Sequence, residues 1–68
     1  MSEFDKQVNA YIIKCGTYTN TIEGRVFHIE ADCYRADNSP DGYIAWWDDD
    51  HGHKTLGKTP TEVYLDLP

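Results

Sequence analysis

The amino-acid sequence predicts a mainly β domain, a small antiparallel meander of four to five short strands. An α+β domain with one N-terminal helix is the alternative. Aromatic residues make up 13% of the chain and β-branched residues are common, whereas leucine is scarce. Two stretches alternate apolar and polar residues, and each lies next to a turn motif that contains glycine. A chain of 68 residues forms a single small domain, residues 1–68.

The segment 3–15 fits either a helix or a strand. Apolar side chains recur at helical spacing at Phe4, Val8, Tyr11, Ile12 and Cys15. Ser2 could cap such a helix and Gly16 could end it. The stretch AYIIKC, residues 10–15, has the β-branched and aromatic content of a strand instead. We expect a strand from about residue 10 and keep the helix as the alternative.

Residues 25–34, RVFHIEADCY, have the clearest strand pattern. Phe27, Ile29, Ala31 and Cys33 alternate with polar residues, which predicts a half-buried strand with Cys33 inside the sheet. Gly24 marks a turn between this strand and the preceding segment, residues 17–22. We expect both cysteines of the chain to be free thiols.

A second strand pattern follows a turn. The motif DNSPDG, residues 37–42, has the residue types of a tight turn, and YIAWW, residues 43–47, follows as a strand. Alternation sends Trp46 and Trp47 to opposite faces, and we assign Trp46 to the core because it shares a face with Ile44.

The last ten residues are also ambiguous. TPTE, residues 59–62, has the spacing of a helix capping box with proline at the first helical position. VYLDL, residues 63–67, alternates as a strand would. We expect the strand, because only six residues follow Glu62.

Charge limits the function classes. Twelve acidic residues and six basic residues give a net charge of −6. This balance disfavours direct nucleic-acid binding, which needs clustered Lys and Arg, and favours a cation or a protein partner with a basic surface.

We expect no membrane association, because no apolar run is long enough to span a bilayer. The N-terminal segment has no apolar signal-peptide core, so we expect a cytoplasmic protein.

One stretch suggests a metal ligand set. Asp37–Asp48 places oxygen-bearing side chains at the spacing of a calcium loop, with Gly42 at the sixth position and Ile44 at the eighth. The stretch resembles the twelve-residue loop of EF-hand proteins, although its last position is aspartate where the family has glutamate. The resemblance implies a Ca²⁺ site with these ligands: Asp37, Ser39, Asp41, Tyr43 and Asp48. The alternative is an ordinary turn in an acidic chain.

The function that we favour is non-enzymatic protein binding, because we find no catalytic motif. Tryptophan and tyrosine dominate interface hot spots, and here they adjoin a run of three aspartates. The expected contact residues are Tyr43, Trp46, Trp47, Asp48, Asp49 and Asp50. In size and acidity the chain is similar to phage-encoded inhibitors, which implies an accessory or inhibitory protein that binds a host enzyme or complex. The outward-facing tryptophan could instead cover a dimer seam, so a homodimer is a further alternative.

Overall fold

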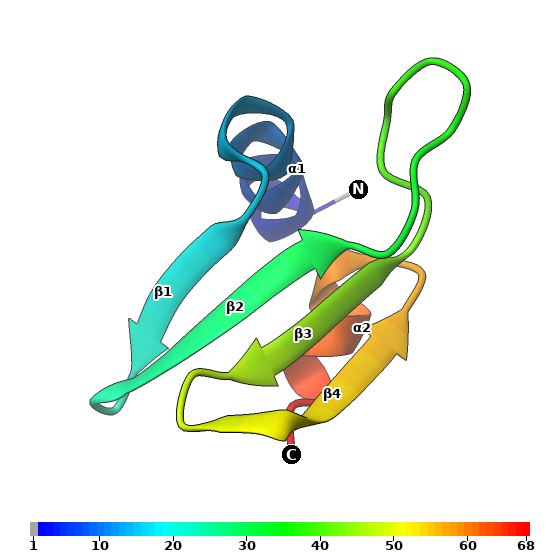
Figure 1. Cartoon of the computed structure of the whole chain (residues 1–68). Coiled ribbons are helices and arrows are strands. Elements are labelled where there is room, and N and C mark those ends of the chain that lie inside the picture. The colour runs from blue at the N-terminus through cyan, green and yellow to red at the C-terminus, as the bar shows by residue number, and fades with distance from the viewer. Residues whose placement is uncertain (1) are drawn as a thin grey trace.

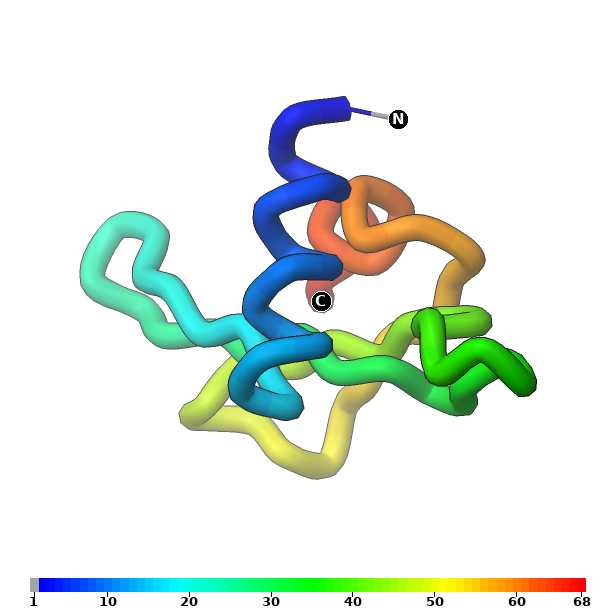
Figure 2. The backbone as a smooth tube through the Cα atoms, turned by 90° about the horizontal axis from the view of Figure 1, so that it is seen from above, coloured from blue at the N-terminus to red at the C-terminus, as the bar shows by residue number. Residues whose placement is uncertain are grey.

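The computed structural model describes residues 2–68 and contains one antiparallel sheet with two helices (Figure 1). The elements in chain order are α1 (Glu3–Cys15), β1 (Tyr18–Ile22), β2 (Arg25–Ala31), β3 (Tyr43–Trp47), β4 (Asp50–Gly57) and α2 (Pro60–Leu65). The strand order β1-β2-β3-β4 follows the sequence, which confirms the predicted meander. Both helices lie on the same side of the sheet (Figure 2), and the opposite face is left uncovered.

The N-terminal segment is a helix, so the strand expected from residue 10 is wrong. The Ser2 side chain caps it by accepting a hydrogen bond from the Asp5 N–H at 3.1 Å. Gly16 ends it in the left-handed conformation, with φ of 86°, and donates to the Ile12 carbonyl. Val8 and Ile12, which are 0% and 2% exposed, share the buried stripe of the helix. Burial of this stripe outweighs the local strand propensity of residues 10–15.

The hairpin β1–β2 closes through a two-residue turn. Glu23 and Gly24 have φ of 50° and 81°, the positive values that a tight hairpin turn requires. Phe27 and Ile29 of β2 are buried, as the alternation predicts. Cys33 is exposed, however, because β2 ends at Ala31 and the chain leaves the sheet there. The prediction that Cys33 lies inside the sheet is therefore wrong.

The β2–β3 connection is longer than the tight turn predicted at residues 37–42. It extends the hairpin through an isolated bridge between Tyr34 and Pro40. Near its tip the Asn38 N–H donates to the Arg35 carbonyl at 2.9 Å, so the turn begins before Asp37. Pro40 is buried rather than exposed at the turn, because the loop folds back beside α1.

The C-terminal segment is the short helix α2, and the strand expected at residues 63–67 is wrong. Thr59 caps it by accepting from the Glu62 N–H at 3.1 Å, which confirms the helix-start signal in TPTE. Val63 is fully buried against the sheet and α1. A helix of six residues is marginal alone, so its position depends on this burial.

One core lies between the helices and the sheet. Its buried members are Val8, Ile12, Tyr18, Phe27, Ile29, Tyr43, Ala45 and Val63. Within residues 2–68, no helix is long and apolar enough to cross a membrane.

Candidate functional site

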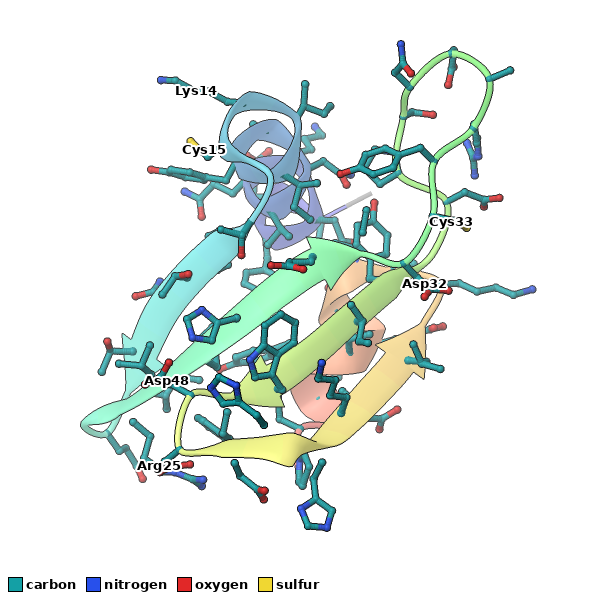
Figure 3. All side chains as sticks on the ribbon, in the orientation of Figure 1. Lys14, Cys15, Arg25, Asp32, Cys33 and Asp48 are labelled. Atoms are coloured by element: carbon teal, nitrogen blue, oxygen red, sulfur yellow. The ribbon has the colours of Figure 1, made fainter. Side chains whose placement is uncertain are left out.

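The uncovered face of the sheet carries a row of side chains that crosses all four strands. The pairing register places Thr19 opposite His28, His28 opposite Trp46, and Trp46 opposite Lys54. We call these four residues the cross-strand row. Figure 3 shows the ring side chains of this face in front of the ribbon, with the helices behind. Strand register therefore gathers residues that are separated by up to 35 positions in the chain.

Hydrogen bonds fix the imidazole of His28 in this row. Its Nδ1 atom lies 2.9 Å from the Thr19 hydroxyl, and its Nε2 atom lies 2.8 Å from Asp48 Oδ1. The Asp48 carboxylate can only accept, so Nε2–H is the donor of that hydrogen bond, and Nδ1 bonds with the Thr19 hydroxyl. With both nitrogens bonded, the ring has a single favourable orientation.

Ring contacts hold Trp46 at the centre of the row. Its ring centroid lies 5.3 Å from that of His28 and 6.5 Å from that of His51. Lys54 Nζ lies 4.9 Å from the same centroid, within cation–π range. Trp46 Nε1 is buried and has no hydrogen-bond partner within residues 2–68. An unpaired buried N–H costs about 1–3 kcal/mol, so ring packing rather than hydrogen bonding holds this indole.

The first and last of the three aspartates pair with histidines. Asp48 Oδ1 also lies 3.9 Å from His51 Nε2. Asp50 Oδ1 lies 2.9 Å from His53 Nδ1, and this hydrogen bond raises the pKa of His53. The β3–β4 turn is therefore held by carboxylate–imidazole contacts at the end of the uncovered face.

The middle aspartate is anchored to the start of β2. Arg25 donates two hydrogen bonds to Asp49, at 2.7 and 3.1 Å, and these bonds lower the pKa of the Asp49 carboxyl. Figure 3 shows Arg25 beside the same sheet corner as Asp48. The charge of Asp49 is thus neutralised within the chain, which leaves it less able to attract a basic partner than Asp48.

The two tryptophans lie on opposite faces, but the predicted assignment is reversed. Trp47 lies on the helix side, where its ring packs edge-on against Phe27 at 6.2 Å between centroids. The Arg25 guanidinium lies 4.1 Å from the centroid of the Trp47 ring. Trp46 lies on the uncovered face, because the helices cover the side that carries Tyr43 and Trp47.

Tyr43 lies apart from the other expected contact residues. It is 5% exposed on the helix side, and its hydroxyl donates to Asn9. Burial raises the pKa of this hydroxyl. A side chain buried in this way offers almost no surface to a partner, so the candidate contact reduces to Trp46, Asp48 and their neighbours.

The residues of the expected calcium loop are divided between the two ends of β3. The Asp37 carboxylate accepts from the Ser39 N–H and hydroxyl at 3.0 and 2.6 Å, which lowers the pKa of Asp37. Asp41 and Asp48 flank β3, which corresponds to a separation of roughly 20 Å along an extended strand. Asp50–Gly57 form strand β4, where an EF-hand has the helix that follows its loop. In the described chain, no three His, Cys, Asp or Glu side chains lie together as a metal site.

Three members of the cross-strand row were missed by sequence reasoning. Alternation within one strand does not show which residues of other strands lie opposite. It therefore could not place Thr19, His28 and Lys54 beside Trp46. The order hydroxyl, imidazole, carboxylate in Thr19, His28 and Asp48 is also that of hydrolase triads. The cavities of about 610 and 410 Å³ both lie on the helix side, away from this hydroxyl. We therefore interpret the hydrogen bonds as a device that orients His28.

Comparisons of the chain with protein-family models, with curated proteins and with solved structures gave no match.

Proposed function

We propose that the protein is a small acidic, non-enzymatic protein-binding module that acts as an accessory or inhibitory protein. It binds a basic surface of its partner through the uncovered face of the sheet. The observation that carries this proposal is a sheet face without a helix layer, with Trp46 held rigidly at its centre.

The cross-strand row has the properties of an interface hot spot. A tryptophan that is already fixed by its neighbours loses little conformational entropy when a partner covers it. Contacts with His28 and Lys54 fix Trp46 in this way. Ile44 and Leu56, which pair across β3 and β4 on the same face, extend the apolar area, and Leu56 is 64% exposed. Aromatic and aliphatic surface surrounded by polar groups is the usual anatomy of a protein interface.

Carboxylates flank this apolar centre. Glu30 lies on the same face as His28, and Figure 3 shows Asp32 and Asp48 near opposite ends of the sheet. Lys54 carries the positive charge of the row, so these three acidic residues outnumber it on this face. Together with the net charge of −6, this arrangement supports a partner with exposed Lys and Arg.

The first test is affinity capture with matched variants. The parent chain, Trp46→Ala and Ile13→Ala are immobilised, and retained proteins are compared. Ile13 is the control because it is 65% exposed on α1, away from the uncovered face. We expect a basic protein that the parent and Ile13→Ala retain and Trp46→Ala loses. Retention by all three chains alike would show that this face is not the contact.

The second test measures rates with the captured partner. Trp46→Ala should chiefly speed dissociation, with a loss of about 2 kcal/mol or more for a hot-spot residue. The combined variant Glu30→Gln, Asp32→Asn and Asp48→Asn should chiefly slow association and flatten its salt dependence. An unchanged association rate in that variant would contradict the basic-surface part of the proposal.

A further inference from the structure

The outer edge of β1 has main-chain groups that no neighbouring strand pairs with. Ile22 and Arg25 close the tight turn as a hydrogen-bonded pair, so alternation directs the main-chain groups of Thr19 and Thr21 away from β2. The Thr21 N–H accordingly has a side-chain acceptor, Asn20 Oδ1 at 2.8 Å. That amide oxygen serves as the acceptor that the carbonyl of a neighbouring strand would otherwise provide.

The two edges of the sheet differ in how well they are protected against pairing with a strand of another chain. The outer strand β4 contains Asp50, His51, His53 and Lys54, and its pairing with β3 is irregular beside Trp47. Charges and irregular pairing are features that block edge-to-edge association. The other outer strand, β1, has the sequence YTNTI, without a charge or a proline, and pairs regularly over its whole length. Strand addition is therefore favoured at β1.

The sequence of β1 is nearly symmetric about Asn20. An antiparallel pair of two β1 strands with Asn20 opposite itself places Thr19 of one copy opposite Thr21 of the other. Because both threonines direct their main-chain groups outward, each such pair can exchange both of its hydrogen bonds. The same register places Tyr18 opposite Ile22, an aromatic and β-branched pair of the kind that stabilises sheets. A two-fold interface requires this self-complementarity.

A charge-free groove adjoins this edge on the helix side. Its cavity has a volume of about 610 Å³. The lining residues are Ser2, Phe4, Gln7, Tyr18, Asn20, Ile22, Phe27, Thr61, Tyr64 and Leu65, none of them charged. Two chains of net charge −6 repel each other, and this repulsion is least where they meet through neutral surface. The lining of this groove offers a basic partner no carboxylate.

We propose that a second copy of this chain pairs with the β1 edge, in register about Asn20, and that its groove residues pack against the groove of the first copy. The result is a two-fold dimer with one continuous sheet of two meanders. The Thr21 N–H exchanges its Asn20 side-chain acceptor for the Thr19 carbonyl of the second copy.

Sedimentation analysis of two double variants tests the register. In Thr19→Lys with Thr21→Lys, lysines face each other across the interface, whereas in Thr19→Lys with Thr21→Glu each lysine faces a glutamate. Both positions are exposed, and both variants lose the same Thr19–His28 hydrogen bond. We expect the lysine–lysine variant to dimerise about tenfold or more weakly than the lysine–glutamate variant. Net charge alone predicts that the lysine–lysine variant dimerises more tightly, because its chain carries the smaller negative charge.

The groove has its own matched pair of variants. Leu65 is 73% exposed in the groove and Ile13 is 65% exposed outside it. Leu65→Lys should weaken the dimer, while Ile13→Lys should leave its dissociation constant unchanged. A parent chain that stays monomeric up to about 500 μM would overturn the proposal. Equal dimerisation of the two threonine double variants would equally overturn it.

Discussion

Asp5 in the first turn of α1 accepts two hydrogen bonds from Thr61 in the first turn of α2. Its Oδ1 atom lies 2.9 Å from the Thr61 nitrogen and 2.7 Å from the Thr61 hydroxyl oxygen. Asp5 is only 8% exposed, so this carboxylate joins the two helices from within the structure. A negative charge at the start of a helix also complements its exposed N–H groups.

Replacing Asp5 by alanine should lower the free energy of unfolding by about 2–3 kcal/mol, because two donors of Thr61 lose a charged acceptor. Urea denaturation measures this loss. Glu3→Ala is the control, since the Glu3 side chain is 93% exposed and forms an ion pair with Lys6 at 3.6 Å on the surface. That control should stay within about 0.5 kcal/mol of the parent. Equal losses in the two variants would contradict a structural role for the Asp5–Thr61 contact.

The Asp5 contact should also make stability depend on acid pH. Burial raises the pKa of Asp5, but the hydrogen bonds with Thr61 and Ser2 together outweigh burial and hold the pKa below the ordinary value of 3.8. The carboxylate therefore stabilises the fold fully above that ordinary pKa and loses its contribution as pH falls through the lower folded value. Denaturation curves below about pH 4 should fall more steeply for the parent than for Asp5→Asn. Parallel curves would show that this carboxyl does not carry the effect.

The two tryptophans should differ in stability measurements. Trp47→Ala removes packing against Phe27 and Arg25, so we expect a loss of about 3 kcal/mol. Trp46→Ala should cost less, because it also removes a buried N–H that has no acceptor within the described residues. Chemical denaturation of the two single variants checks the order. A larger loss for Trp46→Ala would mean that the uncovered face is part of the folding core.

Calcium binding by Asp37–Asp48 stays a prediction that a melting experiment can test. Since Asp37 and Asp48 lie beyond opposite ends of β3, we expect millimolar Ca²⁺ to leave the melting temperature nearly unchanged. A site at 100 times its Kd would add about 2.7 kcal/mol, or about ten degrees for a domain of this size. An increase of that size that Asp37→Ala abolishes would instead establish the calcium site.

Both cysteines should react with a thiol reagent in the folded protein, because Cys15 and Cys33 are free and exposed. Figure 3 shows them on different elements, Cys15 at the end of α1 and Cys33 in the β2–β3 loop. Adding a reductant should leave the free energy of unfolding unchanged, whereas loss of a disulfide between them would cost about 3 kcal/mol. Such a cost on reduction would contradict the free-thiol prediction.

Local patterns predicted the central strands because their signals agree with one another. Around Phe27 and Ile29, alternation, β-branched content and the Gly24 turn all favour a strand. At residues 10–15 the signals conflict, since Ile12 and Ile13 favour a strand while Ser2 and Gly16 favour a helix. The helix forms because the sheet offers Val8 and Ile12 a surface to pack on, and that surface is built by distant residues. The same reason applies to α2, which Asp5 anchors from the other end of the chain.

The site was less predictable than the fold. Alternation showed that Trp46 and Trp47 face opposite sides, but the helices decide which side is the core, and the local patterns favoured strands at both helical segments. The cross-strand row depends on the register of three strand pairs, which a one-residue shift would change completely. His28 and Lys54 therefore could not be joined to Trp46 from their spacing in the sequence.

The contact between Asp5 and Thr61 can form only late in the synthesis of the chain. During synthesis, α1 and all four strands leave the ribosome before residues 60–65. The nascent chain then contains the Asp5 carboxylate without its partner Thr61, and a core that still lacks Val63. The sheet hairpins are local and can form early, but docking of the last helix closes the structure. Nascent chains that stop at Gly57 should remain sensitive to protease, with protection gained only when α2 has emerged.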